Sequence, residues 1–266
     1  MNGHDVTHAA ARASDNPALE WAARAGYATS GLLHLLIGWI ALQVAVGGGG
    51  KNADQSGALA SLADNGLGKV LLWVAVLGFL GLALWQLADA LVGHAGEDKD
   101  VWADRAKALG KAVVYLALAW SALTFARGRS TNSKSQSVDF TAKLLDKPGG
   151  RLLVVVVGLA VLAVGAYHVY KGWKKKFLED LEENPGTWAT RAGQVGYVAK
   201  GVALAIVGIL FCAAGVHQQP KEATGLDGAL KSLRDQPFGT GLLVIMAAGF
   251  ACYGLYSFAR GRHAKL

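Results

Sequence analysis

Charged residues are scarce in this sequence. Asp, Glu, Lys and Arg make up 17% of the 266 residues, whereas roughly a quarter is usual for a globular domain. There are five prolines and two cysteines, Cys212 and Cys252, and both cysteines fall inside long apolar runs. Their spacing fits no metal site and nothing supports a disulfide between them, so we expect both to pack as small apolar residues. With so little charge, much of the chain consists of uncharged segments.

Six of these uncharged stretches are long enough, or nearly so, to cross a bilayer, which takes roughly 17–25 helical residues. A soluble helix would carry a polar stripe facing water, and Leu152–Gly165 and Leu242–Leu255 have none. The sequence therefore predicts an all-α integral membrane protein with six transmembrane helices. Two stretches are short unless Lys111 and Lys200 snorkel towards the lipid headgroups. The predicted spans are Tyr27–Val46, Val70–Ala88, Ala112–Ala126, Leu152–Tyr170, Gly201–Val216 and Thr240–Ala259.

A signal peptide is also lacking, because the first 25 residues are polar and include Asp5, Asp15 and Glu20. We therefore expect the first span to be retained in the membrane. The net charge of +7 comes from Lys and Arg at the edges of apolar runs, so no nucleic-acid partner is expected. More than half of these basic residues fall on the side of the two termini. By the positive-inside rule, both termini are then cytoplasmic.

An internal repeat organises the chain. Gly26–Gly31 aligns with Gly196–Gly201, and the alignment continues to Trp85 over Tyr256. A more divergent middle copy aligns Tyr167 with the same position. The expected organisation is a polar N-terminal segment (1–24) followed by three two-span repeats, 25–95, 105–174 and 191–262. Because the copies insert the same way round, they are parallel repeats, and a bundle of three helical hairpins with approximate three-fold symmetry is the expected fold.

Small residues recur at equivalent places in each repeat. The first helices carry them seven apart (Gly31 and Gly38, Ala112 and Ala119, Gly201 and Gly208), and the second helices carry them three apart (Gly78 and Gly81, Ala160 and Ala163, Gly249 and Cys252). Small residues allow helices to approach closely in lipid. We interpret these pairs as the packing seams of the hairpins.

The connection inside each hairpin repeats as well. Ser56–Leu62, Val138–Leu145 and Asp227–Leu233 have apolar residues at helical spacing, and each is followed by an acid, Asp64, Asp146 or Asp235. A short amphipathic helix on the outer membrane surface fits this pattern, with the acid ending the helix near a turn.

The repeated Gly-Tyr-x-x-x-Gly opening, the Gly-Ala-Leu connection and the Pro-Phe-Gly turn resemble the domain of unknown function 1206 family of bacterial membrane proteins. The resemblance spans roughly residues 21–262. The middle copy departs from it, because no Gly-Tyr precedes Ala112 and Gly149-Gly150 replaces Phe-Gly. The resemblance implies six spans, three repeats and a bacterial plasma (inner) membrane location. It implies no agreed activity, so no functional residues are carried over.

Polar residues inside spans are the candidate functional residues. His34 and His168 raise a haem-ligand hypothesis, although hydrogen-bonded packing histidines are the simpler interpretation. Gln43 and Gln86 are further candidates. Asp89, Lys171 and Arg260 occupy equivalent positions in the three repeats and could form an ion-pair cluster at the cytoplasmic mouth, or stand as unlinked boundary residues.

No catalytic motif is evident. Gly47–Gly50 precedes Lys51 but ends a membrane span, which is not the setting of a phosphate loop, and no HExxH or GxSxG occurs. The basic run Lys174–Lys176 beside Trp173 is an orientation anchor that could also contact anionic lipid. The leading hypothesis is a non-enzymatic scaffold or accessory subunit that packs against a membrane partner or itself. The alternatives are a small-solute or ion permeation protein with a path between the repeats, and a haem- or quinone-linked redox protein.

Overall fold

The computed structural model describes residues 16–48, 50–92 and 101–265, and within these ranges every regular element is helical. Six long helices are α2 (Pro17–Ala45), α4 (Gly66–Val92), α5 (Val101–Ala126), α7 (Gly150–Trp173), α8 (Thr187–His217) and α10 (Gly239–His263). Three short helices, α3 (Gln55–Ala63), α6 (Ser133–Leu145) and α9 (Gly225–Arg234), connect them in pairs. Two 3-10 turns, η1 (Lys176–Asp180) and η2 (Pro220–Glu222), complete the chain.

The predicted spans are confirmed. All six long helices are long and apolar enough to cross a membrane, so the chain is a multi-pass membrane protein. The first helix begins earlier than expected, at Pro17, where the Asn16 side chain accepts a hydrogen bond from the Ala18 N–H. Residues 17–24, assigned from sequence to the polar N-terminal segment, therefore form the first two turns of α2.

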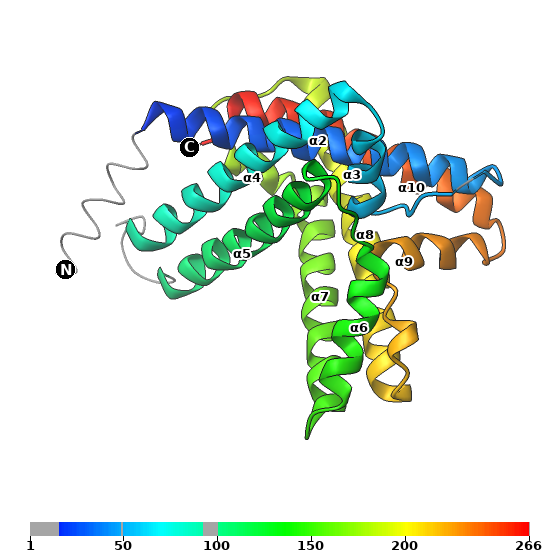
Figure 1. Cartoon of the computed structure of the whole chain (residues 1–266). Coiled ribbons are helices and arrows are strands. Elements are labelled where there is room, and N and C mark those ends of the chain that lie inside the picture. Colours follow the sequence, from blue (N-terminus) through cyan, green and yellow to red (C-terminus); the bar gives the residue numbers. More distant parts are fainter. Residues whose placement is uncertain (1–15, 49, 93–100, 266) are drawn as a thin grey trace.

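The long helices associate in three antiparallel pairs that join neighbouring repeats (Figure 1). The second long helix of each repeat packs along the first long helix of the next, giving the pairs α4–α5, α7–α8 and α10–α2. The last pair joins the final helix to the first, as an approximate three-fold ring requires. In Figure 1 the pairs run in clearly different directions, so the bundle is splayed.

The hairpins are less regular than the sequence suggests. The two long helices pack on each other in the first repeat (α2–α4) and in the third (α8–α10), but α5 and α7 of the middle repeat do not pack along each other. The ring is therefore open between α5 and α7. These two helices are also the least covered of the six: in the most apolar 18-residue segment of each, 28% of α5 and 17% of α7 is buried.

The small residues do form seams, but those of the first helices lie between repeats and not within a hairpin. A Cβ on Gly31 would lie 2.8 Å from the Gly254 carbonyl oxygen of α10, and one on Gly201 would lie 2.6 Å from the Gly165 oxygen of α7. Within a hairpin, Gly78 meets Gly26 at similar range. The expectation that all these residues are hairpin seams is thus correct for Gly78, Gly81 and Gly249 of the second helices. It is wrong for the first-helix glycines of those pairs, which meet the preceding repeat of the ring, and for Ala160 and Ala163, which are exposed on α7.

The three short helices are present as predicted, and Asp64, Asp146 and Asp235 are the residues at which they end. The first of them, α3, packs against α2, α4 and α5, and Ser56 to Leu59 are buried. This helix is therefore part of the protein core.

Candidate functional site

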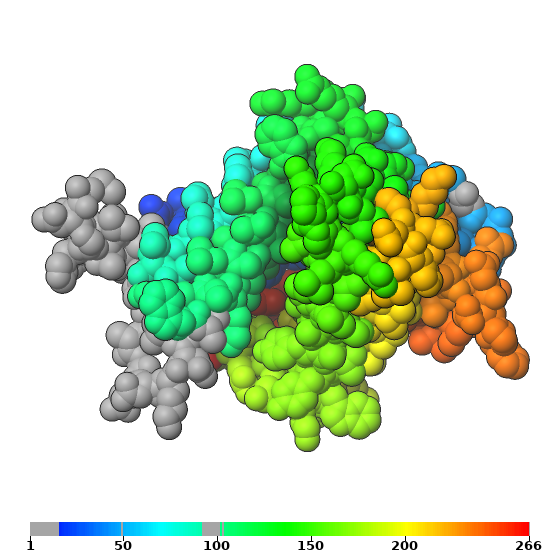
Figure 2. All heavy atoms as spheres, turned by 90° about the horizontal axis from the view of Figure 1, so that it is seen from below, coloured from blue at the N-terminus to red at the C-terminus, as the bar shows by residue number. Residues whose placement is uncertain are grey.

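Below, the terminal ends are the ends of the six long helices that lie towards the chain termini and the connections between repeats, and the hairpin ends are the opposite ends. Figure 2 shows a hollow between the α4–α5 pair and α7, and the red atoms of the C-terminal part of α10 are visible at its floor. We call it the α5–α7 hollow. It follows from the missing contact between α5 and α7, and it is where the ionisable groups of the terminal ends gather.

Asp180 at the end of η1 is the acidic centre of this group. Its Oδ2 accepts a hydrogen bond from Lys171 Nζ at 2.6 Å and lies 3.4 Å from an Arg260 guanidinium nitrogen. Burial by itself raises the pKa of Asp180, but the charges of Arg260 and Lys171 outweigh burial and lower the pKa overall. The ionised carboxylate is therefore the stable form, shared by two cations from different repeats.

The segment that carries Asp180 is fixed by the C-terminus. The Lys265 N–H donates to the Asp180 carbonyl, the Glu182 N–H donates to the His263 carbonyl, and Leu181 forms an isolated bridge with Ala264. Because these bonds hold η1 across the end of α10, the Asp180 carboxylate is kept next to the Arg260 guanidinium.

Tyrosines surround this ion pair. The ring of Tyr197 packs against Tyr253 and Tyr256 with centroids 5.2 and 5.5 Å away, and its hydroxyl accepts a 3.4 Å hydrogen bond from Arg260. Arg260 also lies over the ring of Tyr27, 4.5 Å from its centroid. The buried Arg260 guanidinium is thereby held by aromatic rings as well as by a carboxylate.

Two further lysines lie near this group, the partly buried Lys200 and the exposed Lys111. Lys200 Nζ lies 4.2 Å from the Tyr253 ring centroid, and Lys111 of α5 lies within electrostatic range of Arg260, Asp180 and Lys171. Helix α8 includes Gln194–Ala199, the extension that snorkelling of Lys200 was expected to allow, and the Lys200 ammonium lies on an aromatic face of α10.

Both intramembrane histidines are hydrogen-bonded to their own helix. His34 is buried, its Nδ1 lies 2.6 Å from the Ser30 carbonyl oxygen, and its ring packs on Tyr253. His168 is partly exposed, with Nδ1 2.8 Å from the Val164 oxygen and its ring stacked on Tyr197. Both rings therefore contact the aromatic cluster, His34 at Tyr253 and His168 at Tyr197.

The remaining candidates are placed differently. Gln43 is exposed near the hairpin end of α2, away from the other polar residues. Gln86 is 5% exposed and its Oε1 is buried without a hydrogen-bond partner. Asp89 is partly buried and acts electrostatically on Lys111. The structure thus brings Lys171 and Arg260 together, as the repeat alignment suggested, but on Asp180.

Sequence reasoning missed Asp180, Tyr197 and the inward direction of Lys200. The repeat alignment held a usable signal for the direction of Lys200. Ser30, Lys111 and Lys200 are equivalent residues, and each directly precedes the first small residue of a seam. Asp180 has no such signal, since it lies in a connection outside the repeats.

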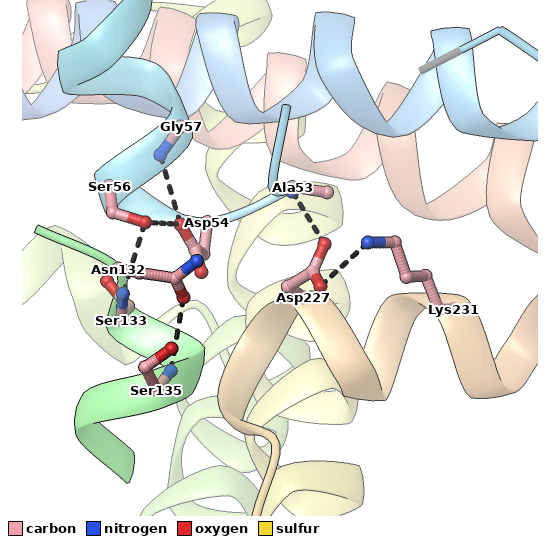
Figure 3. Close-up of polar contacts among 9 residues, drawn as sticks. All are labelled: Ala53, Asp54, Ser56, Gly57, Asn132, Ser133, Ser135, Asp227 and Lys231. Atoms are coloured by element: carbon pink, nitrogen blue, oxygen red, sulfur yellow. Dashed lines mark hydrogen bonds and ion pairs between the residues drawn. The ribbon is translucent and has the colours of Figure 1, made fainter. Parts of the chain in front are cut away.

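A second polar cluster joins the three hairpin connections (Figure 3). Asp227 of α9 is fully buried and its Oδ1 accepts from the Ala53 N–H at 2.9 Å, while its Oδ2 pairs with Lys231 at 2.8 Å. Ser56 Oγ accepts from the Ser133 N–H at 3.2 Å. These bonds tie the first repeat to the third and to the second, so the cluster fixes the hairpin ends against one another.

Asp54 is the N-cap of α3 in this cluster. Its Oδ1 accepts from the Ser56 hydroxyl and the Gly57 N–H, whereas its Oδ2 is buried without a partner. Burial raises the pKa of Asp54, and the charge of Asp227 adds to the shift against the opposing hydrogen bonds. This carboxylate is costly when ionised.

An Asp54→Asn variant is therefore expected to be more stable than the native protein near pH 7, because Asn keeps the capping oxygen and removes the charge. The pKa of Asp54 is higher in the folded state than in the unfolded state, so stability is lost as pH rises from about 4 through the folded pKa. The advantage of the variant should then shrink towards pH 4. Thermal unfolding in detergent across this range tests it. The exposed C-cap variant Asp146→Asn is the control, and an advantage independent of pH would contradict the assignment.

Comparisons with known proteins agree with the repeat architecture. A family model described as Domain of Unknown Function (DUF1206) matches three successive segments, residues 25–93, 106–175 and 195–264. The chain is also similar to an uncharacterised protein, YxxB of Bacillus subtilis (strain 168), with 28% identity over 246 residues that cover 90% of this chain and 88% of the relative. No solved structure matches.

Proposed function

This chain belongs to the DUF1206 family, and on that premise we propose that it is a non-enzymatic accessory protein of the bacterial inner membrane that recognises a carboxylate or phosphate group in the α5–α7 hollow. The terminal ends face the cytoplasm in this proposal, since the basic residues concentrate there. The accessory role agrees with the absence of catalytic motifs from the sequence.

One observation carries the proposal: four cations converge on the hollow from four helices. Lys171 and Arg260 contact Asp180, Lys200 lies on Tyr253, and Lys111 is within electrostatic range of the first two. The carboxylates that act on Lys111 are those of Asp180 and Asp89. Cations removed from water are costly unless paired, so an excess of them favours binding of an anion.

An unpaired hydrogen-bond donor on Arg260 also supports the binding of an anion. The Arg260 Nε is buried without a hydrogen-bond partner, although the guanidinium already contacts Asp180 and Tyr197. Guanidinium groups bind planar carboxylate and phosphate oxygens with paired donors. The open side of the ring supplies the entrance.

Thermal unfolding of the purified protein in an uncharged detergent tests the proposal. Sodium phosphate and sodium succinate are each compared with sodium chloride at equal ionic strength. Binding to the folded state should stabilise it by about 2.7 kcal/mol when the anion is at 100 times its dissociation constant. The Lys200→Gln variant should lose this response, whereas Lys69→Gln, exposed at the hairpin end of α4, should keep it. An unchanged response in Lys200→Gln, or none in the native protein, contradicts the proposal.

Permeation of a small anion is the second candidate, because the polar groups come from all three repeats. Permeation is disfavoured because, in the part of the chain that the structure describes, no polar path continues from the cluster towards the hairpin ends. There, α2 has buried apolar residues such as Ile37 and Ile40, and Gly38 packs closely on α10. Reconstitution in liposomes loaded with labelled phosphate separates the two: an accessory protein binds without releasing the label.

A further inference from the structure

An apolar groove lies on the lipid-facing side of α8 and α10. Its volume is about 560 Å³, and apart from Gln194 its walls are apolar. Val195, Val198 and Val202 form one wall, and Leu242, Ile245 and Met246 form the other. The groove reaches from Trp173, at the end of α7, to Leu233 of α9.

The close approach of the two helices makes the floor of this groove. A Cβ on Gly249 would lie 2.2 Å from the Ala199 Cβ, so only glycine lets α10 come this near to α8. The walls above the floor stay open, since Val195 is 52% exposed and Ile245 is 67% exposed. In a protein whose spans are surrounded by lipid, the species present to fill such a groove is an acyl chain.

The terminal end of the groove has the features of a lipid headgroup site. Trp173 lines it and is 74% exposed, which is typical of tryptophan at the membrane interface. The exposed Lys174 follows directly, and the exposed Arg191 lies one turn before Gln194 on α8. Basic residues at the ends of neighbouring spans attract anionic headgroups.

Two other lysines near this end have partners inside the protein. Lys171 is held by Asp180 inside the protein. Lys176 lies over the Tyr170 ring of α7, 5.4 Å from its centroid. The cations considered next to the groove are thus Lys174, which follows α7, and Arg191, near the start of α8.

We propose that this groove binds one acyl chain of an anionic phospholipid, whose phosphate is held by Lys174 and Arg191. The site is separate from the α5–α7 hollow and does not depend on the anion site there. It selects lipid by two independent features, an apolar groove for the chain and a paired cationic end for the phosphate.

Native mass spectrometry of the protein released from detergent micelles tests the site. Phosphatidylglycerol and phosphatidylcholine with identical acyl chains are added in equal amounts, and phosphatidylglycerol adducts should dominate. The double variant Lys174→Gln/Arg191→Gln should weaken phosphatidylglycerol binding about tenfold or more, because each basic residue near the surface contributes to the attraction. Lys147→Gln, exposed at the hairpin end, is its control.

The acyl-chain part is tested by filling the groove. Val195→Trp should reduce adducts of both lipids, whereas Ile209→Trp, on the same helix, 56% exposed and outside the groove lining, should not. Thermal unfolding and size-exclusion profiles check that each variant is folded. Equal retention of the two lipids by the native protein, or equal losses in the two tryptophan variants, would overturn the proposal.

Discussion

Replacing Gly201 by alanine is expected to destabilise the protein by about 1–3 kcal/mol, the usual cost of overpacking. The new Cβ would lie 2.6 Å from the Gly165 oxygen and 2.7 Å from the Val169 nitrogen, both backbone atoms of α7. Backbone atoms cannot swing aside as a flexible side chain does, so α7 and α8 must separate along their whole interface. In lipid, close packing is the main attraction between helices, and separation therefore weakens the pair directly.

Gly110 provides a control of opposite sign. It lies inside α5, where a Cβ would meet nothing within 4 Å. Alanine there should stabilise the helix by about 0.5–1 kcal/mol, because glycine loses more conformational freedom on folding. Thermal unfolding in detergent measures both variants. Equal effects at the two positions would show that the α7–α8 seam is not tightly packed.

Replacing Asp180 by asparagine is expected to destabilise the protein by about 2–3 kcal/mol near pH 7, somewhat below the cost of breaking a fully buried ion pair, because this one is partly exposed. Lys171 and Arg260 would lose their shared carboxylate, which is 26% exposed in the native protein. If the hollow recognises anions, phosphate should restore more stability to this variant than to the native protein, since the carboxylate no longer competes for the same cations.

The pH dependence gives this prediction a sign. The pKa of Asp180 is lowered in the folded protein, so its contribution is present above the unfolded pKa of about 4 and is lost as pH falls through the lower folded value. The gap between the native protein and Asp180→Asn should therefore be full at pH 7 and narrow below about pH 4. The exposed α6 variant Asp139→Asn controls for general charge effects. A gap that widens with acid would mean that Asp180 is not ionised in the folded state.

The spans and the repeat were predictable because lipid imposes a simple rule on length and polarity. Leu152–Tyr170 has few alternatives to a membrane helix, and the copies share glycine positions such as Gly31 and Gly201. Which helix each glycine meets was not predictable, because a small face fits any neighbour with a matching one. The partner of Gly201 is set by the order in which all six helices fill space.

The candidate site was predictable only in part. The equivalence of Lys171 and Arg260 followed from the repeat, and their meeting on one carboxylate did not. Asp180 lies in η1, a short turn without periodicity, and its position is fixed by backbone bonds to the last residues of the chain. Lys200 was assigned to the headgroup region because an ammonium within a span usually reaches for water. The Tyr253 ring, more than fifty positions later, offers it a closer alternative.

The pairing of α2 with α10 bears on how the protein is made. During synthesis the first span enters the bilayer long before its most extensive neighbour exists, since α10 follows the other five long helices in the chain. Until then the glycine face of α2 around Gly31 and Gly38 is left to lipid or to other membrane proteins. Contacts between segments far apart in the chain form slowly, so the pairing of α2 with α10 is a late step. A chain truncated just before α10 should therefore insert five spans and leave this face of α2 unpaired.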